Sequence, residues 1–143
     1  MEFGIAFKGE MDGQRCIAIA RQIEAAGFDY AWFFDSHILW RDCYPQMARI
    51  LEHTKNIKTG PLVTNPNVRD WSVAASTFAT LATDNQNRFD LAVGRGDSSM
   101  RVMGKRPATL DRMADYIRAV KGMVRGDEVQ YGDCPAPVKF EWA

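Results

Sequence analysis

The sequence predicts an α/β fold that forms part of a (β/α)8, or TIM, barrel, with about four βα units and a C-terminal extended hairpin. Short apolar segments alternate four times with longer segments of helical periodicity, which is typical of a parallel sheet. No GxGxxG loop follows the first apolar segment, which disfavours an open nucleotide-binding sheet. Polar residues instead follow the second, third and fourth segments, as in barrels that carry function at the C-terminal ends of successive strands.

Residues 2–8 and 12–26 are predicted to form the strand and the helix of the first βα unit. Residues 2–8 are apolar and favour a strand, and residues 12–26 repeat apolar side chains at three- and four-residue steps along one helix face. Gly27 ends this helix, because glycine adopts the left-handed conformation without a Cβ penalty. Residues 28–34 are apolar at nearly every position, which predicts a strand covered on both faces.

The same pattern continues along the rest of the chain. Each remaining apolar segment is short enough for a strand, and each amphipathic segment is long enough for a helix. The expected elements are helix 45–53, strand 57–64, helix 70–83, strand 88–93, helix 109–125 and an extended hairpin at 128–142. The 143 residues are therefore expected to form a single domain, residues 1–143, with a core of its own.

Composition excludes several classes of partner. Eighteen basic residues balance eighteen acidic ones, so no field of one sign favours nucleic acid. No apolar run approaches the ~20 residues that span a bilayer, and the first ten residues do not resemble a secretory signal. The three cysteines are widely spaced without a CxxC motif, which predicts reduced thiols and a cytoplasmic location. Only two histidines occur, far apart, so no metal centre is expected.

The segment after residues 28–34 carries the first candidate site. Asp35, Ser36 and His37 bring a carboxylate, a hydroxyl and an imidazole to the end of a strand, where they can polarise a carbonyl or move a proton. The alternative is structural: Asp35 and Ser36 cap a turn, and His37 packs under Trp40.

The segments after the third and fourth strands carry further candidates. Thr64 and Asn65 have short polar side chains that can hydrogen-bond a planar heterocycle, although the same segment can also form a turn that caps the next helix. Arg69 suits either an anion contact or a buried ion pair. The Gly94–Ser98 segment has two glycines that let a backbone approach a ligand, although GxG is also common in ordinary turns.

Four strings in the sequence resemble the luciferase-like oxidoreductases that use flavin or deazaflavin. They are FFDSHILW, LVTNPNVRD, RFDLAVGRGDSS and GDEVQYGDCP, the last of them shortly before KFEWA, and they extend over essentially the whole chain. The string NRFDLAVGRGDSSMRVMGKRP is similar to the deazaflavin branch of the family, the relatives of methylenetetrahydromethanopterin reductase. Complete members have eight strands, so the resemblance implies the N-terminal half of a barrel.

The resemblance implies a cofactor and its site. The cofactor is expected to be the deazaflavin coenzyme F420, with FMN as the alternative, and its ring is expected over the C-terminal mouth of the barrel. The family also implies a distortion of the third strand near Leu62–Val63, for which a non-proline cis peptide is one form and, with half the barrel missing, the ordinary trans form is the alternative. His37 and Asp35 would be catalytic, and the residues in contact with the cofactor would be Leu62, Val63, Thr64, Asn65, Gly94, Arg95, Gly96, Asp97 and Ser98.

The resemblance also implies a reaction and leaves alternatives open. The expected reaction is hydride transfer between the cofactor and a small organic molecule, at a CH–OH or CH–NH group. One alternative is an FMN-dependent monooxygenase, and another is a non-catalytic half-barrel that pairs with another chain. Open sheet edges predict a homo-oligomer or a partner chain that supplies the remaining strands, unless the 128–142 hairpin forms a partial lid. Six residues are expected to face the exposed barrel interior: Ile5, Phe7, Trp32, Phe34, Leu91 and Val93.

Overall fold

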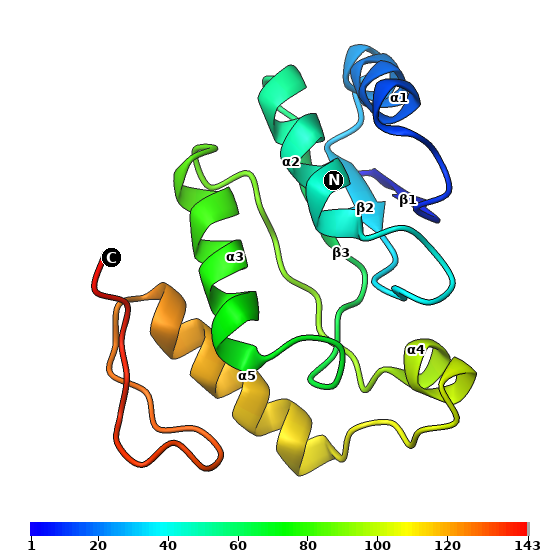
Figure 1. Ribbon diagram of the computed structural model, residues 1–143. Helices are drawn as coiled ribbons and strands as arrows, with labels where there is room; N and C mark the ends of the chain where they lie inside the picture. The colour runs from blue at the N-terminus through cyan, green and yellow to red at the C-terminus, as the bar shows by residue number, and fades with distance from the viewer. Residues whose placement is uncertain (143) are drawn as a thin grey trace.

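The computed structural model describes residues 1–142, in which a parallel sheet is followed and covered by helices (Figure 1). The described elements are β1 (Gly4–Phe7), α1 (Gly13–Ala25), β2 (Tyr30–Phe33), α2 (Cys43–His53), β3 (Lys58–Pro61), α3 (Trp71–Thr83), α4 (Asp97–Val102) and α5 (Leu110–Val124). Strands and helices alternate from β1 to α3, as the sequence predicts for the first three units, and two more helices then follow.

The sheet has the strand order β1-β2-β3, and each neighbouring pair is parallel. The register places Ala31 of β2 between Ile5 of β1 and Thr59 of β3. Each strand is shorter than the sequence predicts. A residue counts as part of a strand only where it pairs with a neighbouring strand, and only four residues of each strand do so. The order confirms successive βα units in one parallel sheet.

The fourth expected strand, residues 88–93, is not a regular strand. Residues 88–94, here called the fourth-strand segment, run parallel to β3 but pair with it only at Thr59↔Phe89 and Thr64↔Val93. Five residue steps separate the two positions on the β3 side and four separate those on the other, so the pairing contains a bulge. The expected continuous strand is therefore corrected to two bridges on either side of a distortion.

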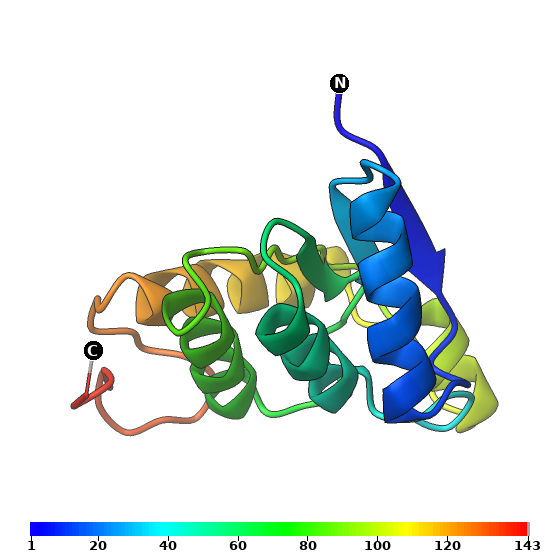
Figure 2. The ribbon, with the colours of Figure 1, turned by 90° about the horizontal axis from the view of Figure 1, so that it is seen from above.

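The helices cover one face of the sheet. Figures 1 and 2 show α1, α2 and α3 in a row across it, and α5 packs beside α3. Ala31 and Phe33 of β2 are fully buried beneath this layer, together with Ile50 and Leu51 of α2. Alternate strand residues thus fill a core that lies between the sheet and its helices.

The prediction of which side chains face the barrel interior is wrong at four of six positions. Trp32 and Phe34 do lie on the open face, away from the helices, since they alternate with buried Ala31 and Phe33. The other four pack against the core instead: Ile5, Phe7, Leu91 and Val93. The register causes this, because Ile5 and Phe7 lie opposite Ala31 and Phe33 and so share their face.

The open face carries a connected polar chain. The Tyr30 hydroxyl donates to Asp90 at 2.8 Å, and Lys58 Nζ donates to that hydroxyl at 3.3 Å and to Glu2 at 3.0 Å. Burial and then the bond to Asp90 raise the pKa of Tyr30 above its ordinary value. The Tyr30 ring stacks on Trp32, with centroids 4.6 Å apart. Lys58 and Glu2 therefore form an ion pair on this face, whereas Asp90 is bonded to the neutral Tyr30 hydroxyl.

Side-chain caps set the helix boundaries. Asp42 accepts a hydrogen bond from the Tyr44 backbone at 3.1 Å, so α2 starts at Cys43 and not at the expected residue 45. The six-residue α4 was not among the expected helices, and it begins directly after Gly96. None of the helices within residues 1–142 has the length and apolar character required to cross a membrane.

The C-terminal hairpin pairs only at Val129↔Val138, where two backbone hydrogen bonds of 2.8 and 2.9 Å join the two arms. It packs at the α3–α5 end of the molecule (Figure 2): Tyr131 lies against Trp71 of α3, and Val129 lies against Gly122 of α5. The described contacts of the hairpin are thus with the helical layer, and the expected alternative of a lid over the open face is corrected.

Candidate functional site

A cavity of about 440 Å³ lies at the C-terminal ends of the strands. Three loops close around it: those that follow β2, β3 and the fourth-strand segment. The expected convergence of these loops at one end of the sheet is confirmed. The lining residues are Phe34, Asp35, Ser36, Leu39, Trp40, Leu62, Val63, Asn65, Gly94, Arg95, Gly96, Asp97, Ser98 and Ser99.

Two of the predicted site residues do not line this cavity. His37 is exposed in the loop whose neighbours Ser36 and Leu39 line the wall, so it lies at the same end of the sheet without facing the cavity. The Trp40 ring packs with Lys8, whose Nζ lies 5.3 Å from the ring centroid. Thr64 is buried, with 1% of its surface exposed, and its role is to hold a lining residue.

Asp35 is that lining residue, and it is anchored from two sides. Its Oδ2 accepts hydrogen bonds from the Thr64 hydroxyl at 2.7 Å and from the Tyr44 hydroxyl at 3.0 Å. All three side chains are buried. Burial and the adjacent Asp35 carboxylate raise the pKa of Tyr44, which keeps its hydroxyl protonated as a donor. Asp35 thus ties the loop after β2 to α2 and to the end of β3.

The wall between Asp35 and the fourth-strand segment is formed by Leu62 and Val63. The peptide bond between them is cis, and regular β3 pairing stops at Pro61, so the expected distortion of the third strand is confirmed. Leu62 and Val63, which directly follow β3, are 37% and 40% exposed although both are apolar. With Phe34 and Leu39, they give the cavity an apolar lip.

The two glycines of the third loop are explained by packing onto β3. A Cβ at Gly94 would lie 2.6 Å from Val63 Cγ2, and a Cβ at Gly96 would lie 2.5 Å from Asn65 Cγ. Gly96 also has a positive φ of 88°. The space that a side chain would need at Gly94 and Gly96 is occupied by the side chains of Val63 and Asn65. This modifies the expectation that the two glycines make room for a ligand.

Asn65 links the second and third loops. Its Nδ2 donates to the Ser99 hydroxyl of α4 at 3.1 Å, and its Oδ1 accepts from the Asn67 backbone at 3.0 Å. Asn65 and Ser99 are both nearly fully buried. Arg95 also holds local structure, since its Nε donates to the Ala108 carbonyl at 2.7 Å. These bonds give the cavity a fixed rim before any ligand is present.

Two residues of this site escaped sequence reasoning. Tyr44 lies just before the expected helix start at residue 45, although the Asp42 cap stands two residues before it. Ser99 directly follows the Gly94–Ser98 segment and is not among the contacts that the sequence predicts. Of the two alternatives for Arg69, the structure shows an ion pair: Nη2 lies 2.5 Å from Asp42 Oδ2. The Arg69 guanidinium also lies 4.3 Å from the centre of the Tyr44 ring.

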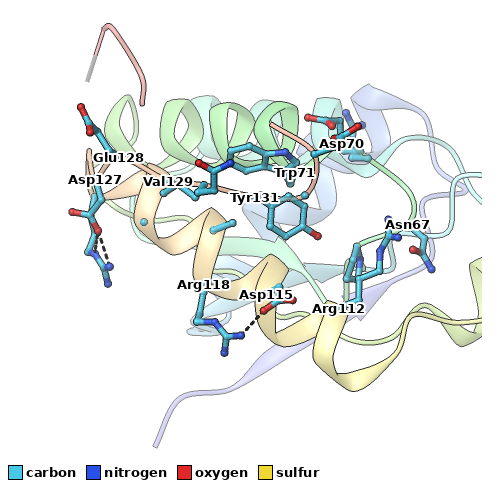
Figure 3. Close-up of a pocket in the computed structure, with 18 of the residues that line it drawn as sticks. Asn67, Asp70, Trp71, Arg112, Asp115, Arg118, Asp127, Glu128, Val129 and Tyr131 are labelled. Atoms are coloured by element: carbon cyan, nitrogen blue, oxygen red, sulfur yellow. Dashed lines mark hydrogen bonds and ion pairs between the residues drawn. The ribbon is translucent and has the colours of Figure 1, made fainter. Parts of the chain in front are cut away.

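A second hollow of about 1140 Å³ lies between the start of α3, the outer face of α5 and the C-terminal hairpin (Figure 3). Trp71 and Tyr131 meet at its wall with ring centroids 5.1 Å apart. Some of its charged groups form ion pairs with each other: Arg118 with Asp115, and Arg125 with Asp127. Of the candidates named from the sequence, Arg69 lines this hollow, whereas most of the others line the smaller cavity, which is therefore the candidate site.

Comparison with known proteins places this geometry in a family context. The family model described as luciferase-like monooxygenase matches residues 1–140. The 5,10-methylenetetrahydromethanopterin reductases of Archaeoglobus fulgidus and Methanolobus tindarius are each 30% identical to the chain, over 135 and 133 residues. These matches include 92% and 90% of this chain and 40% of each relative.

Solved structures show the same similarity. The coenzyme F420-dependent tetrahydromethanopterin reductase of Methanopyrus kandleri matches with a TM-score of 0.78 at 25% identity, over 96% of this chain and 46% of that one. The oxygenating constituent of 3,6-diketocamphane monooxygenase from Pseudomonas putida, in complex with FMN, matches in fold with a TM-score of 0.76 at 18% identity, over 96% and 43% of the two chains. The chain thus spans less than half the length of these relatives.

Proposed function

The chain belongs to the luciferase-like monooxygenase family, and on this premise we propose that it is an oxidoreductase whose cavity at the C-terminal end of the sheet binds a flavin or deazaflavin. Coenzyme F420 is the first choice, because relatives at 30% identity are methylenetetrahydromethanopterin reductases and the similar Methanopyrus kandleri reductase depends on F420. The proposed reaction is hydride transfer between this cofactor and a small organic substrate. The three cysteines are unpaired, which supports a reducing, cytoplasmic location.

The fit of the cavity to a flat heterocycle carries this proposal. Ligand cavities are commonly about 300–1,000 Å³ and mainly apolar, with a few polar groups that fix orientation. The present cavity, of about 440 Å³, offers an apolar lip that includes Phe34, Leu62 and Val63. Its polar lining includes Asp35, Asn65 and Arg95, each of which is held by a hydrogen bond to its surroundings. Such a site can hold a ring against Leu62 and Val63 and orient it by its polar edge.

Each predicted site residue has a proposed part. The bound cofactor would supply the hydride chemistry. Leu62 and Val63 would support the ring, and Thr64 and Asn65 would act from beneath the wall through Asp35 and Ser99. The backbone and side chains of Gly94–Ser98 would close the third side. Asp35 would accept a hydrogen bond from the ligand, and exposed His37 would exchange a proton with substrate at the rim.

We further propose that the open face is covered in the working protein. Trp32 and Phe34 are apolar side chains on the face opposite the helices, and the outer edges of β1 and the fourth-strand segment have no strand neighbour within residues 1–142. Exposed edges and apolar patches favour association. The cover would be a second copy or a partner chain that carries further strands. A half-barrel that pairs without catalysis is the alternative, and it predicts association without cofactor binding.

Titration of the chain with F420 and, separately, with FMN tests the proposal. We expect saturable quenching of the cofactor fluorescence, tighter for F420. Tighter binding of FMN would favour the monooxygenase alternative, and no binding of either cofactor would remove the oxidoreductase proposal for this chain. Val63→Asp places a charge on the apolar wall and should weaken binding at least tenfold. Val73→Asp, on the exposed outer face of α3, is the matched control and should leave binding unchanged.

A further inference from the structure

We propose that Tyr44 is a positioning residue of the cavity: its hydroxyl, with that of Thr64, fixes the Asp35 carboxylate so that the other carboxylate oxygen meets the ligand. The inference rests on the proposed function, since it assigns Tyr44 a role through Asp35 in cofactor binding. Tyr44 itself does not line the cavity. It comes from the first turn of α2, an element that otherwise packs in the core.

The hydrogen bonds carry the inference. Both donors, Tyr44 at 3.0 Å and Thr64 at 2.7 Å, reach the same oxygen, Oδ2 of Asp35. Oδ1 accepts no hydrogen bond from any residue that the structure describes, although Asp35 lines the cavity. A carboxylate with one oxygen held twice cannot turn freely, so its second oxygen keeps one direction. That oxygen is left to accept a hydrogen bond from a ligand N–H or O–H group.

Tyr44 is itself held firmly enough for this task. The Arg69 guanidinium lies 4.3 Å from the centre of its ring, and the Phe78 ring lies 5.8 Å away. Arg69 is in turn paired with Asp42, the residue that caps α2. Tyr44 is only 5% exposed. The phenol therefore has packing partners that restrict its ring and a cap that sets its backbone.

The arrangement also explains why a residue of α2 matters to a site formed by loops. The loop after β2, the first turn of α2 and the end of β3 meet at one carboxylate. Preorganised polar groups raise affinity because the ligand does not have to order them on binding. Loss of the Tyr44 hydroxyl should then weaken ligand binding without removing any atom from the cavity wall.

Substitution of single hydroxyl groups tests this inference in the full 143-residue chain. Tyr44→Phe should weaken binding of F420, or of FMN if that is the tighter ligand, about tenfold, as expected for a hydrogen bond to a charged group. Thr64→Val should have a similar effect, and Thr64→Ser, which keeps the hydroxyl, should restore affinity. Tyr30→Phe is the matched control, because it removes a tyrosine–aspartate bond of 2.8 Å at the opposite end of β2. It should leave affinity unchanged.

A double-mutant cycle separates positioning from general destabilisation. In an Asp35→Asn background, Tyr44→Phe should have no further effect on cofactor affinity, because Tyr44 acts through the carboxylate. Equal losses with and without Asp35 would overturn the inference, and so would unchanged affinity of Tyr44→Phe in a chain that binds cofactor. Failure of the unmodified chain to bind either cofactor overturns the proposed function and, with it, the role of Tyr44. Thermal unfolding of each variant confirms that it is folded under the binding conditions.

Discussion

At the scale of single residues, Gly96 joins two requirements at one position. Its φ of 88° lies in the left-handed region, and its Cα faces Asn65 so closely that a Cβ would lie 2.5 Å from Asn65 Cγ. Asn65 in turn holds Ser99 through a buried hydrogen bond. The rim of the cavity thus depends on the absence of a side chain at this point.

Gly96→Ala should therefore destabilise the fold by more than the backbone conformation alone requires. A non-glycine residue in this region costs about 1–2 kcal/mol, and the contact with buried Asn65 adds to it. Gly104→Ala is the control, since Gly104 has a φ of 67° and no atom within 4 Å of the added Cβ. Urea unfolding measures both variants. Equal losses of unfolding free energy would show that the packing on Asn65 is unimportant.

Individual site residues were predictable from sequence only in part. Asp35 and Asn65 were recognised because short polar residues at the end of a strand face a shared edge. The partners that fix them were not: Tyr44 is nine residues from Asp35, and Ser99 is 34 residues from Asn65. Contacts across such separations depend on how helices pack, which periodicity does not reveal. For His37 the residue type suits proton transfer, but the structure places the residue outside the cavity lining.

At the scale of elements, one carboxylate organises the connection between α2 and β3. Glu24 of α1 accepts backbone hydrogen bonds from Lys55 at 2.9 Å, Asn56 at 2.6 Å and Ile57 at 3.1 Å. Burial alone would raise the pKa of Glu24, but these three bonds, with nearby Arg88, lower it below its ordinary value of 4.5. The Glu24 carboxylate thus provides the acceptor for three backbone N–H groups of this turn.

Glu24→Gln should lower the free energy of unfolding at neutral pH by about 1–2 kcal/mol, because it replaces charged hydrogen bonds by neutral ones. The pKa of Glu24 is lower in the folded state than in the unfolded state. Its stabilisation is therefore present above pH 4.5 and is lost as pH falls through the folded pKa. Denaturant titrations at pH 7 and pH 3 should show the difference between the two proteins shrink. Glu52→Gln, at an exposed position of α2, should change little at either pH.

The order of elements was predictable, whereas the details of strand pairing were not. Helix periodicity and caps such as Asp12 and Asp70 are local, so helix positions followed from sequence closely. The fourth-strand segment looked regular because its residues favour strands. Its backbone instead meets β3 across a bulge, where a Cβ at Gly60 would collide with the Asp90 carbonyl. The phase of β1 was also misjudged, since register depends on the neighbouring strand.

At the scale of the whole molecule, one face of the sheet is covered by helices and the other face is open. The helices bury Ala31 and Phe33, whereas Trp32 and Phe34 look away from them. Hydrophobic pattern predicted the layered fold because every helix has an apolar face. It did not predict which strand residues point outward, since apolar residues occupy both faces of β2.

The open face should mediate association of the chain. We expect light scattering after size-exclusion chromatography to give a mass above that of the 16.1 kDa monomer at micromolar concentration. Ala6→Lys, which adds a charge to the exposed face of β1, should shift the population toward monomer. Ala18→Lys, on the exposed side of α1, controls for the added charge. A monomeric unmodified chain without aggregation would contradict the association proposal.

The polar chain on the open face has a consequence for how this half can be combined with others. Glu2, Lys58, Tyr30 and Asp90 satisfy one another within the chain. A wall laid against them would bury two carboxylates and one ammonium, so it has to match their shape and also supply a donor or a positive group for Asp90, which is bonded here to the neutral Tyr30 hydroxyl. A chimaera that joins this half to the second half of a distant relative should therefore need repacking of apolar side chains around Trp32 and a partner for the Asp90 carboxylate.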